Sequence, residues 1–246
     1  MNRPLRLRCM TAMAIALALA GCRAEPEAEA VAQAPVDNAM PGPGAAQAEP
    51  EAPPPGPFLP PAFDCAQATG DAQKLICSDQ RLAELDVELG RLFTLAKADT
   101  ALGAPALEAL EASQRAWIQR RDACTPSPAL RACILGESVR RIFELRQGYA
   151  AARSDDGGGI SRGPTAWKCA GADVLLSSVF VNGEPPSLAL AWNDHLVPME
   201  AYPDPDGQRY AGKIGDGDVT FLVNGTRAMF AQPGQPALSC EIEPVG

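Results

Sequence analysis

Histidine and aromatic residues are scarce in this 246-residue sequence. His195 is its one histidine, and Phe, Trp and Tyr make up 5% of the chain. A single imidazole rules out His-rich metal sites and most catalysis by a His base, and His195 stands beside Asp194 in an expected hairpin, where we interpret it as structural. The G-x-S-x-G, H-E-x-x-H and P-loop motifs are absent from the sequence as well. We therefore predict a protein that is not an enzyme, with no catalytic residues, no metal and no cofactor.

Basic residues are also few, because 21 Lys and Arg stand against 30 Asp and Glu and give a net charge of −9 at pH 7. A nucleic-acid-binding protein needs a basic face to neutralise phosphates, so we expect no nucleic acid among its partners. An acidic protein instead attracts a cationic protein partner by long-range steering.

The Asp residues between positions 204 and 218 do not form a calcium-binding loop of the EF-hand type. Gly215 is twelfth from Asp204, where such a loop carries Glu.

Residues 1–21 have the composition of a bacterial secretory signal peptide. Three Arg residues precede an apolar run over 10–20, which is too short to span a bilayer. The quartet Leu19-Ala20-Gly21-Cys22 resembles a bacterial lipobox, which implies cleavage before Cys22 and attachment of acyl chains such as palmitate to this residue. Two or more acyl chains give stable membrane anchoring. Arg23 stands where an Asp would resemble an inner-membrane retention signal, so we expect anchoring in the outer membrane, facing the periplasm.

The cysteines indicate disulfides in an exported protein. Of eight Cys, Cys9 is removed with the signal peptide and Cys22 carries lipid, which leaves six. Six Cys outside the cytoplasm are typical of three disulfides, and their spacings resemble neither a zinc knuckle nor a thioredoxin-type pair. Fifteen pairings are open to six Cys. We expect local pairing, as Cys65–Cys77, Cys124–Cys133 and Cys169–Cys240.

Composition and periodicity divide the mature chain into four parts. Residues 22–62 contain the lipidated Cys and an Ala/Pro/Glu-rich stretch that predicts a disordered tether, since it offers too little apolar surface to offset chain entropy. Residues 63–149 predict helices, 150–164 a Gly/Ser/Asp linker, and 165–246 short strands. The expected fold class is α+β as separate domains, with a small disulfide-linked helical bundle followed by a small antiparallel β-barrel.

Leucines at helical spacing define the longest expected helix. Leu82, Leu85, Leu89 and Leu92 share one face, and Asp79 is a plausible N-cap. Pro105 and Ser127-Pro128 mark the starts of two further helices. A shorter helix is expected over 71–77.

The C-terminal part has strand periodicity and hairpin turns. Asn193-Asp194 separates two apolar runs, and Asn224-Gly225 is the strongest short hairpin signal in the chain. Seven or eight antiparallel strands over about 80 residues predict a small barrel or sandwich. A Cys169–Cys240 disulfide would tie its first strand to its last.

The helical half resembles the LprI-type lysozyme-inhibitor family over about 85 residues. The Cys, Leu-Asp and Trp–Arg-Asp–Cys elements occur in the family's order. They are Phe63-Asp64-Cys65-Ala66, Ile76-Cys77-Ser78-Asp79, Leu82-Ala83-Glu84-Leu85-Asp86, Gln114-Arg115-Ala116-Trp117 and Arg121-Asp122-Ala123-Cys124. This resemblance implies a role in lysozyme inhibition, but it assigns no residue to that role.

The C-terminal half resembles the membrane-bound inhibitor of C-type lysozyme, a small disulfide-closed β-barrel. The matching segments are Trp167-Lys168-Cys169, Asp206-Gly207-Gln208-Arg209-Tyr210, Phe221 to Gly225, and Cys240. In that family a Ser-Gly-x-x-Tyr loop and a Lys-Gly turn enter the lysozyme cleft and bind its catalytic carboxylates. The resemblance implies that the lysozyme-binding loops here contain Asp206, Gly207, Tyr210, Asn224 and Gly225.

Two of these positions depart from the family pattern. Asn224 replaces a Lys and loses a charge-assisted hydrogen bond to a carboxylate, while Asp206 replaces a Ser and adds a negative charge.

The sequence leaves two hypotheses about the function open. The first is a lipid-anchored envelope protein that inhibits lysozyme or a related muramidase by placing a loop in its cleft. The second is a non-inhibitory envelope module that binds a cell-wall polymer or an assembly protein.

Overall fold

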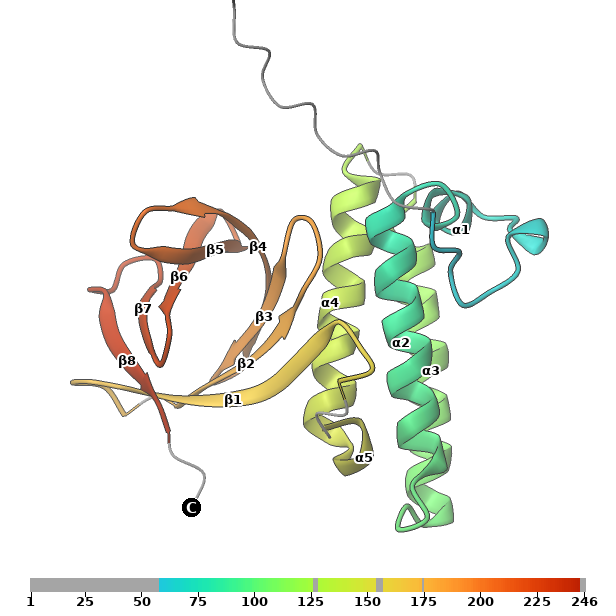
Figure 1. The fold of residues 1–246 in the computed structure, drawn as a ribbon, viewed down its shortest axis with the longest axis horizontal. Coiled ribbons are helices and arrows are strands. Elements are labelled where there is room, and N and C mark those ends of the chain that lie inside the picture. Colours follow the sequence, from blue (N-terminus) through green and yellow to red (C-terminus); the bar gives the residue numbers. More distant parts are fainter. Residues whose placement is uncertain (1–57, 126–127, 154–156, 174, 244–246) are drawn as a thin grey trace, which may run out of the picture. The chain divides into compact units, whose positions relative to one another are not determined.

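The computed structural model describes residues 58–125, 128–153, 157–173 and 175–243. The signal peptide, Cys22 and most of the expected tether lie outside these residues. Helices come first in the chain and an antiparallel β-barrel follows, which confirms the expected fold class (Figure 1). Within the described ranges, no helix has the length and apolar character needed to cross a membrane.

The helical part is built around three long helices that enclose an apolar core. Leu82, Leu85, Leu89 and Leu92 are all buried in this core, as their helical spacing predicts. The third long helix begins at Leu130, two residues beyond Pro128. The elements are η1 (Cys65–Gln67), α1 (Asp71–Ile76), α2 (Gln80–Ala98), α3 (Ala104–Asp122), α4 (Leu130–Gly148) and the short α5 (Ala150–Arg153).

Asp79 caps the start of α2, as the sequence predicts. Its carboxylate accepts a hydrogen bond of 3.0 Å from the N–H of Leu82 and forms an ion pair of 2.7 Å with Arg131 of α4. Desolvation by burial raises the pKa of Asp79, but the Arg131 and Leu82 hydrogen bonds and the Arg131 charge lower it, and the result is a pKa below the usual 3.8.

Replacing Asp79 by Ala should lower the free energy of unfolding by about 1 kcal/mol, because an N-cap is lost. Asp79→Asn is the matched control, since it keeps the cap and loses the charge. A lowered native pKa stabilises only the ionised carboxylate, so the advantage of the unmutated protein over Asp79→Asn should be complete above pH 3.8 and disappear as the pH falls through the native pKa. Urea unfolding of the unmutated protein and of Asp79→Asn over this pH range measures the difference in their free energies of unfolding. A difference that is independent of pH would contradict the ion-pair interpretation.

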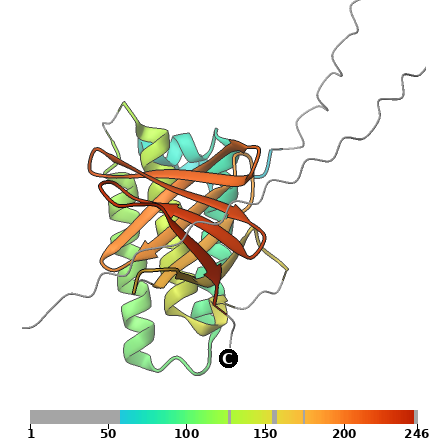
Figure 2. The same ribbon diagram turned by 90° about the vertical axis from the view of Figure 1, so that its left-hand side faces the viewer.

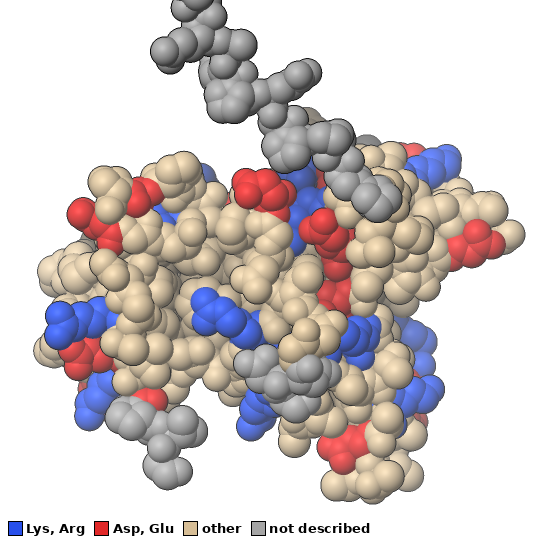
Figure 3. Space-filling view, in the orientation of Figure 1, with Lys and Arg blue, Asp and Glu red and all other residues tan. Residues whose placement is uncertain are grey.

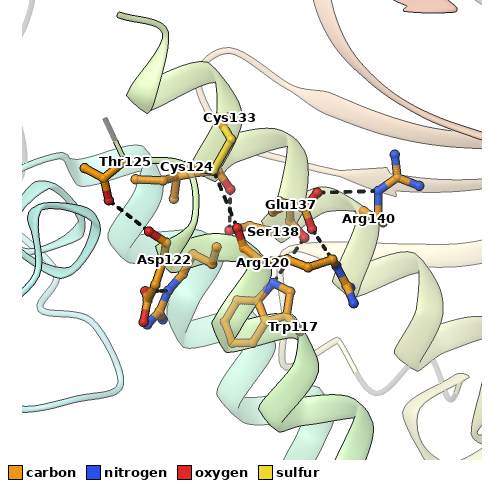
Figure 4. Close-up of a disulfide and its surroundings, with 11 residues drawn as sticks. Trp117, Arg120, Asp122, Cys124, Thr125, Cys133, Glu137, Ser138 and Arg140 are labelled. Carbon is orange, nitrogen blue, oxygen red and sulfur yellow. Dashed lines mark hydrogen bonds and ion pairs between the residues drawn. A yellow bond between two sulfur atoms is a disulfide. The ribbon is translucent and has the colours of Figure 1, made fainter. Parts of the chain in front are cut away.

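Three disulfides join the six described cysteines in the expected pairs. Cys65–Cys77 ties η1 to the end of α1, and Cys124–Cys133 ties the end of α3 to α4 (Figure 4). Beside the second disulfide, the indole N–H of Trp117 donates to the backbone carbonyl of Glu137 at 3.2 Å. These links hold α3 against α4.

Eight strands form a closed antiparallel barrel in which each strand pairs with its neighbours in sequence. The barrel closes where β1 pairs with β8, and Cys169 and Cys240 stand opposite each other and are joined there. The strands are β1 (Ser161–Cys169), β2 (Leu175–Val181), β3 (Ser187–Trp192), β4 (His195–Asp204), β5 (Gly207–Ile214), β6 (Gly217–Asn224), β7 (Arg227–Ala231) and β8 (Leu238–Ile242).

Aromatic side chains fill the barrel. Trp167 lies edge-on to Phe221 with ring centroids 5.3 Å apart, and Trp192 contacts Phe230 at 4.9 Å. These side chains belong to a hydrophobic cluster that contains residues from all eight strands. Among the described residues, the inside of the barrel is therefore a packed core without room for a ligand, so a partner can contact only the outer surface of the barrel.

The helices cover the outer face of β2 and β3. Val179, Val181 and Ala189 are fully buried there in the same hydrophobic cluster as Val139 and Ile142 of α4. Figures 1 and 2 show α4 between the barrel and the other long helices. The helical bundle and the barrel thus share a core, although each keeps its own fold.

The structure places the segment boundaries differently from the sequence expectation. Helix α5 and the first residues of β1, from Ser161, fall within the expected 150–164 linker. The last residues of the expected tether also have partners, because the N–H of Ala62 donates to Asp86 of α2 at 2.9 Å. Regular structure and contacts therefore extend further at both boundaries than composition suggests.

Buried charges join the two parts. Arg146 of α4 is 1% exposed, and it donates to Ser161 Oγ at 2.7 Å and to the carbonyl of Gly163 at 3.1 Å. Glu88 of α2, which is 2% exposed, accepts from the N–H of Ser161 at 3.3 Å. Arg81 donates to the carbonyl of Asn182 at 2.6 Å. Polar groups at the edges of β1 and β2 are thus satisfied by helix side chains, as buried polar groups require.

Candidate functional site

The two turns identified from the sequence lie at the same end of the barrel. Asp206 is in the turn between β4 and β5, and Gly225 is in the turn between β6 and β7. Because β5 pairs with β6, the two turns are neighbours. A hydrogen bond of 2.9 Å joins them, from the side-chain Nδ2 of Asn224 to the backbone carbonyl of Asp206.

Asp204 organises the first turn. Its carboxylate accepts the N–H of Asp206 at 2.9 Å and forms an ion pair with Arg209 of β5. The hydrogen bond from the Asp206 backbone, followed by that from Arg209, holds the pKa of Asp204 below its usual range. The carboxylate of Asp204 is therefore ionised and paired at neutral pH.

Two glycines are required by the backbone at this site. Gly207 has φ of 153°, and a Cβ placed on it would lie 2.4 Å from the carbonyl oxygen of Val223. Gly225 has φ of 60°, the left-handed conformation that a tight hairpin turn needs. The backbone conformation alone therefore explains why glycine occupies both positions, whether or not a partner binds there.

Tyr210 does not join the other four residues at the surface. It is 5% exposed and points into the barrel, where its ring lies 5.9 Å from that of Phe180. Desolvation by burial raises the pKa of its hydroxyl. Tyr210 therefore supports the turn from inside the core, a role that the alternation of β5 explains, because neighbouring positions of a strand point to opposite faces.

A hollow of about 320 Å³ lies beside the two turns. Besides Asp206 and Asn224, its lining includes Leu222, Arg227 and Met229. Met229 stands opposite Leu222 in the β6–β7 ladder and is 43% exposed. Sequence reasoning missed Met229, although its place between Ala228 and Phe230, which face inward, was a sufficient signal for an outward-facing apolar side chain.

The other chemistry-bearing residues lie away from the turns. His195 begins β4, and its ring is 5.2 Å from that of Trp192. Among the residues that the structure describes, no group of three or more His, Cys, Asp or Glu could hold a metal ion. On the face shown in Figure 3, acidic and basic side chains are interspersed. The negative net charge is therefore not concentrated on that face in a patch of one sign.

Residues 65–145, which include α1 to α3 and most of α4, match the family model described as lysozyme inhibitor LprI. This match confirms the LprI-type prediction for the helical part. The description is that of an inhibitor and not of an enzyme.

Curated relatives agree with this match. Proteins named lipoprotein LprI, from Mycobacterium bovis and Mycobacterium tuberculosis, are 26% identical to this chain over 150 residues. The aligned stretch covers 61% of this chain and 70% of each relative. No solved structure matches the chain.

Proposed function

We propose that this chain is a lipid-anchored protein of the bacterial envelope that binds and inhibits lysozyme or a related muramidase. The description of the family matched by residues 65–145 and the name of the lipoprotein relatives support this proposal. The lipobox-like quartet ending at Cys22 supports attachment to a membrane, which we expect to be the outer membrane, facing the periplasm. The cationic partner that an acidic chain attracts fits the same proposal.

The barrel end with the two joined turns is the proposed contact with the lysozyme cleft. Gly225 and Asp206 stand at the tips of their turns, and both are exposed. The bond between Asn224 and Asp206 is the observation that carries the proposal, because it makes one continuous edge from two segments of the chain. Such an edge can block a cleft sterically. Tyr210 is left out of the contact because it is buried.

Inhibition assays across lysozyme classes test the function. The mature chain carrying Cys22→Ser, which removes the lipid site, should slow the lysis of bacterial cell walls by at least one class of lysozyme. Gly225→Trp should reduce this inhibition, since it adds bulk at the tip of the β6–β7 turn. Gly171→Trp, in the turn between β1 and β2, is the matched control, because that glycine also has a positive φ. The proposal fails if no class of lysozyme binds at micromolar protein and low salt.

A second function is favoured by the charge of Asp206. A carboxylate in the turn would repel the acidic residues of a lysozyme cleft unless it became protonated. An envelope module that binds a cell-wall polymer or an assembly protein would face no such penalty. Pull-down from envelope extract with the Cys22→Ser protein, compared with the turn variant, separates the two functions. Recovery of a partner other than lysozyme, lost in the turn variant, would favour the second.

A further inference from the structure

We infer that Asn224 is a positioning residue, which fixes the β4–β5 turn against the β6–β7 turn so that a protein partner meets both turns as one rigid edge. The inference rests on the proposed function and assigns Asn224 a different role within it. The sequence pattern suggested that this position donates to the partner. The structure assigns the amide to the neighbouring turn.

Side chains from two strands hold the backbone of Asp206 on both sides. Asp204, at the end of β4, accepts its N–H at 2.9 Å, and Asn224, at the end of β6, donates to its carbonyl at 2.9 Å. Arg209 pairs with Asp204 and holds that carboxylate in place. The peptide groups flanking Asp206 therefore have fixed orientations although the residue is exposed.

The strands also approach closely next to this bond. The Cβ position of Gly207 lies 2.4 Å from the carbonyl oxygen of Val223 and 3.4 Å from the Cβ of Asn224. A side chain at position 207 would push β5 away from β6 and lengthen the bond between Asn224 and Asp206. Gly207 and the Asn224 side chain thus both determine how closely the β4–β5 turn lies against the end of β6.

This arrangement uses only the backbone of Asp206, and its carboxylate stays exposed beside the turns. Among the described residues it makes no hydrogen bond or ion pair, and it lines the hollow beside the turns. Holding a turn in its bound conformation reduces the entropy cost of association, and this advantage is lost when the restraint is removed. Loss of one such hydrogen bond corresponds to roughly a three- to tenfold weaker affinity.

The test measures turn order and binding separately. Asn224→Ala removes the bond, and Asn224→Asp keeps the shape but places an acceptor against the carbonyl of Asp206. Asp194→Ala, in the exposed turn between β3 and β4 at the other end of the barrel, is the control. Hydrogen exchange and backbone order parameters of residues 204–208 are measured by NMR on the free Cys22→Ser protein. Association and dissociation rates are measured with the lysozyme that the unmutated protein inhibits best.

We expect both Asn224 variants to loosen residues 204–208 and to weaken lysozyme binding about three- to tenfold, mainly through faster dissociation. Asp194→Ala should change neither quantity. A double-mutant cycle of Asn224→Ala with Asp204→Ala should be non-additive, because both side chains hold the backbone of Asp206.

Two results would overturn the inference. Weaker binding with an ordered turn would mean that Asn224 contacts the partner directly, and a loosened turn with unchanged binding would mean that its rigidity is irrelevant. If the unmutated protein binds no lysozyme, the proposed function fails. The NMR measurement on the free protein still decides the role of Asn224 in that case, because a turn that stays ordered in Asn224→Ala would overturn the inference.

Discussion

Replacing Arg146 by Ala should lower the free energy of unfolding by about 3–5 kcal/mol, because it leaves buried acceptors without their cation. Arg146 donates to Ser161 and Gly163 of β1, and its guanidinium lies 3.8 Å from the carboxylate of Glu88. Its removal leaves a carboxylate that is 2% exposed with less compensating charge. Both the helical bundle and the barrel should be destabilised, because Arg146 belongs to a helix and its acceptors belong to the barrel.

Urea unfolding followed by far-UV circular dichroism and by tryptophan fluorescence measures this effect. Trp117 reports on the helices, and Trp167 and Trp192 report on the barrel. Arg140→Ala on the same helix is the matched control, because Arg140 is 33% exposed and should contribute about 0–0.5 kcal/mol. A loss below about 1 kcal/mol for Arg146→Ala would show that the buried network does not hold the two parts together.

The second large effect is expected at the closure of the barrel. Cys169→Ser with Cys240→Ser opens a loop with a sequence separation of 71, which the loop-entropy model values at about 4 kcal/mol. The same model gives about 3 kcal/mol for Cys65→Ser with Cys77→Ser, where the separation is 12. Both proteins are compared by chemical unfolding under non-reducing conditions. A larger loss for the short loop would contradict the expected order.

Local patterns were sufficient to predict most of the elements. Leucines at helical spacing identified α2, and Asn224-Gly225 identified the turn between β6 and β7. These signals are reliable because each depends on residues close in sequence. The cysteine pairs were predictable for a similar reason, since two of them close short loops and the third joins the ends of the barrel.

The shared core could not be derived in the same way. Arg81, Glu88 and Arg146 resemble solvated charges on a helix, and the burial of Arg81 and Glu88 depends on strands about 70 to 100 residues away in the chain. One signal was present: Val179, Phe180 and Val181 are consecutive apolar residues, a pattern of strands that are buried on both faces. The hydrogen bond between Asn224 and Asp206 could not be predicted from the sequence, because its acceptor is a backbone carbonyl 18 residues away that only the fold brings close.

The closure of the barrel by its last strand has a consequence for the order in which an exported chain folds as it emerges from the membrane. Both disulfides of the helical part close within residues 65–133, so this part can be completed before any strand emerges. β2 and β3 then emerge beside a finished apolar surface that can receive Val179 and Ala189. β1 gains its second neighbouring strand only when β8 pairs with it, and α4 and α5 already contact β1 by then. The helices therefore offer a preformed apolar face on which the sheet can assemble.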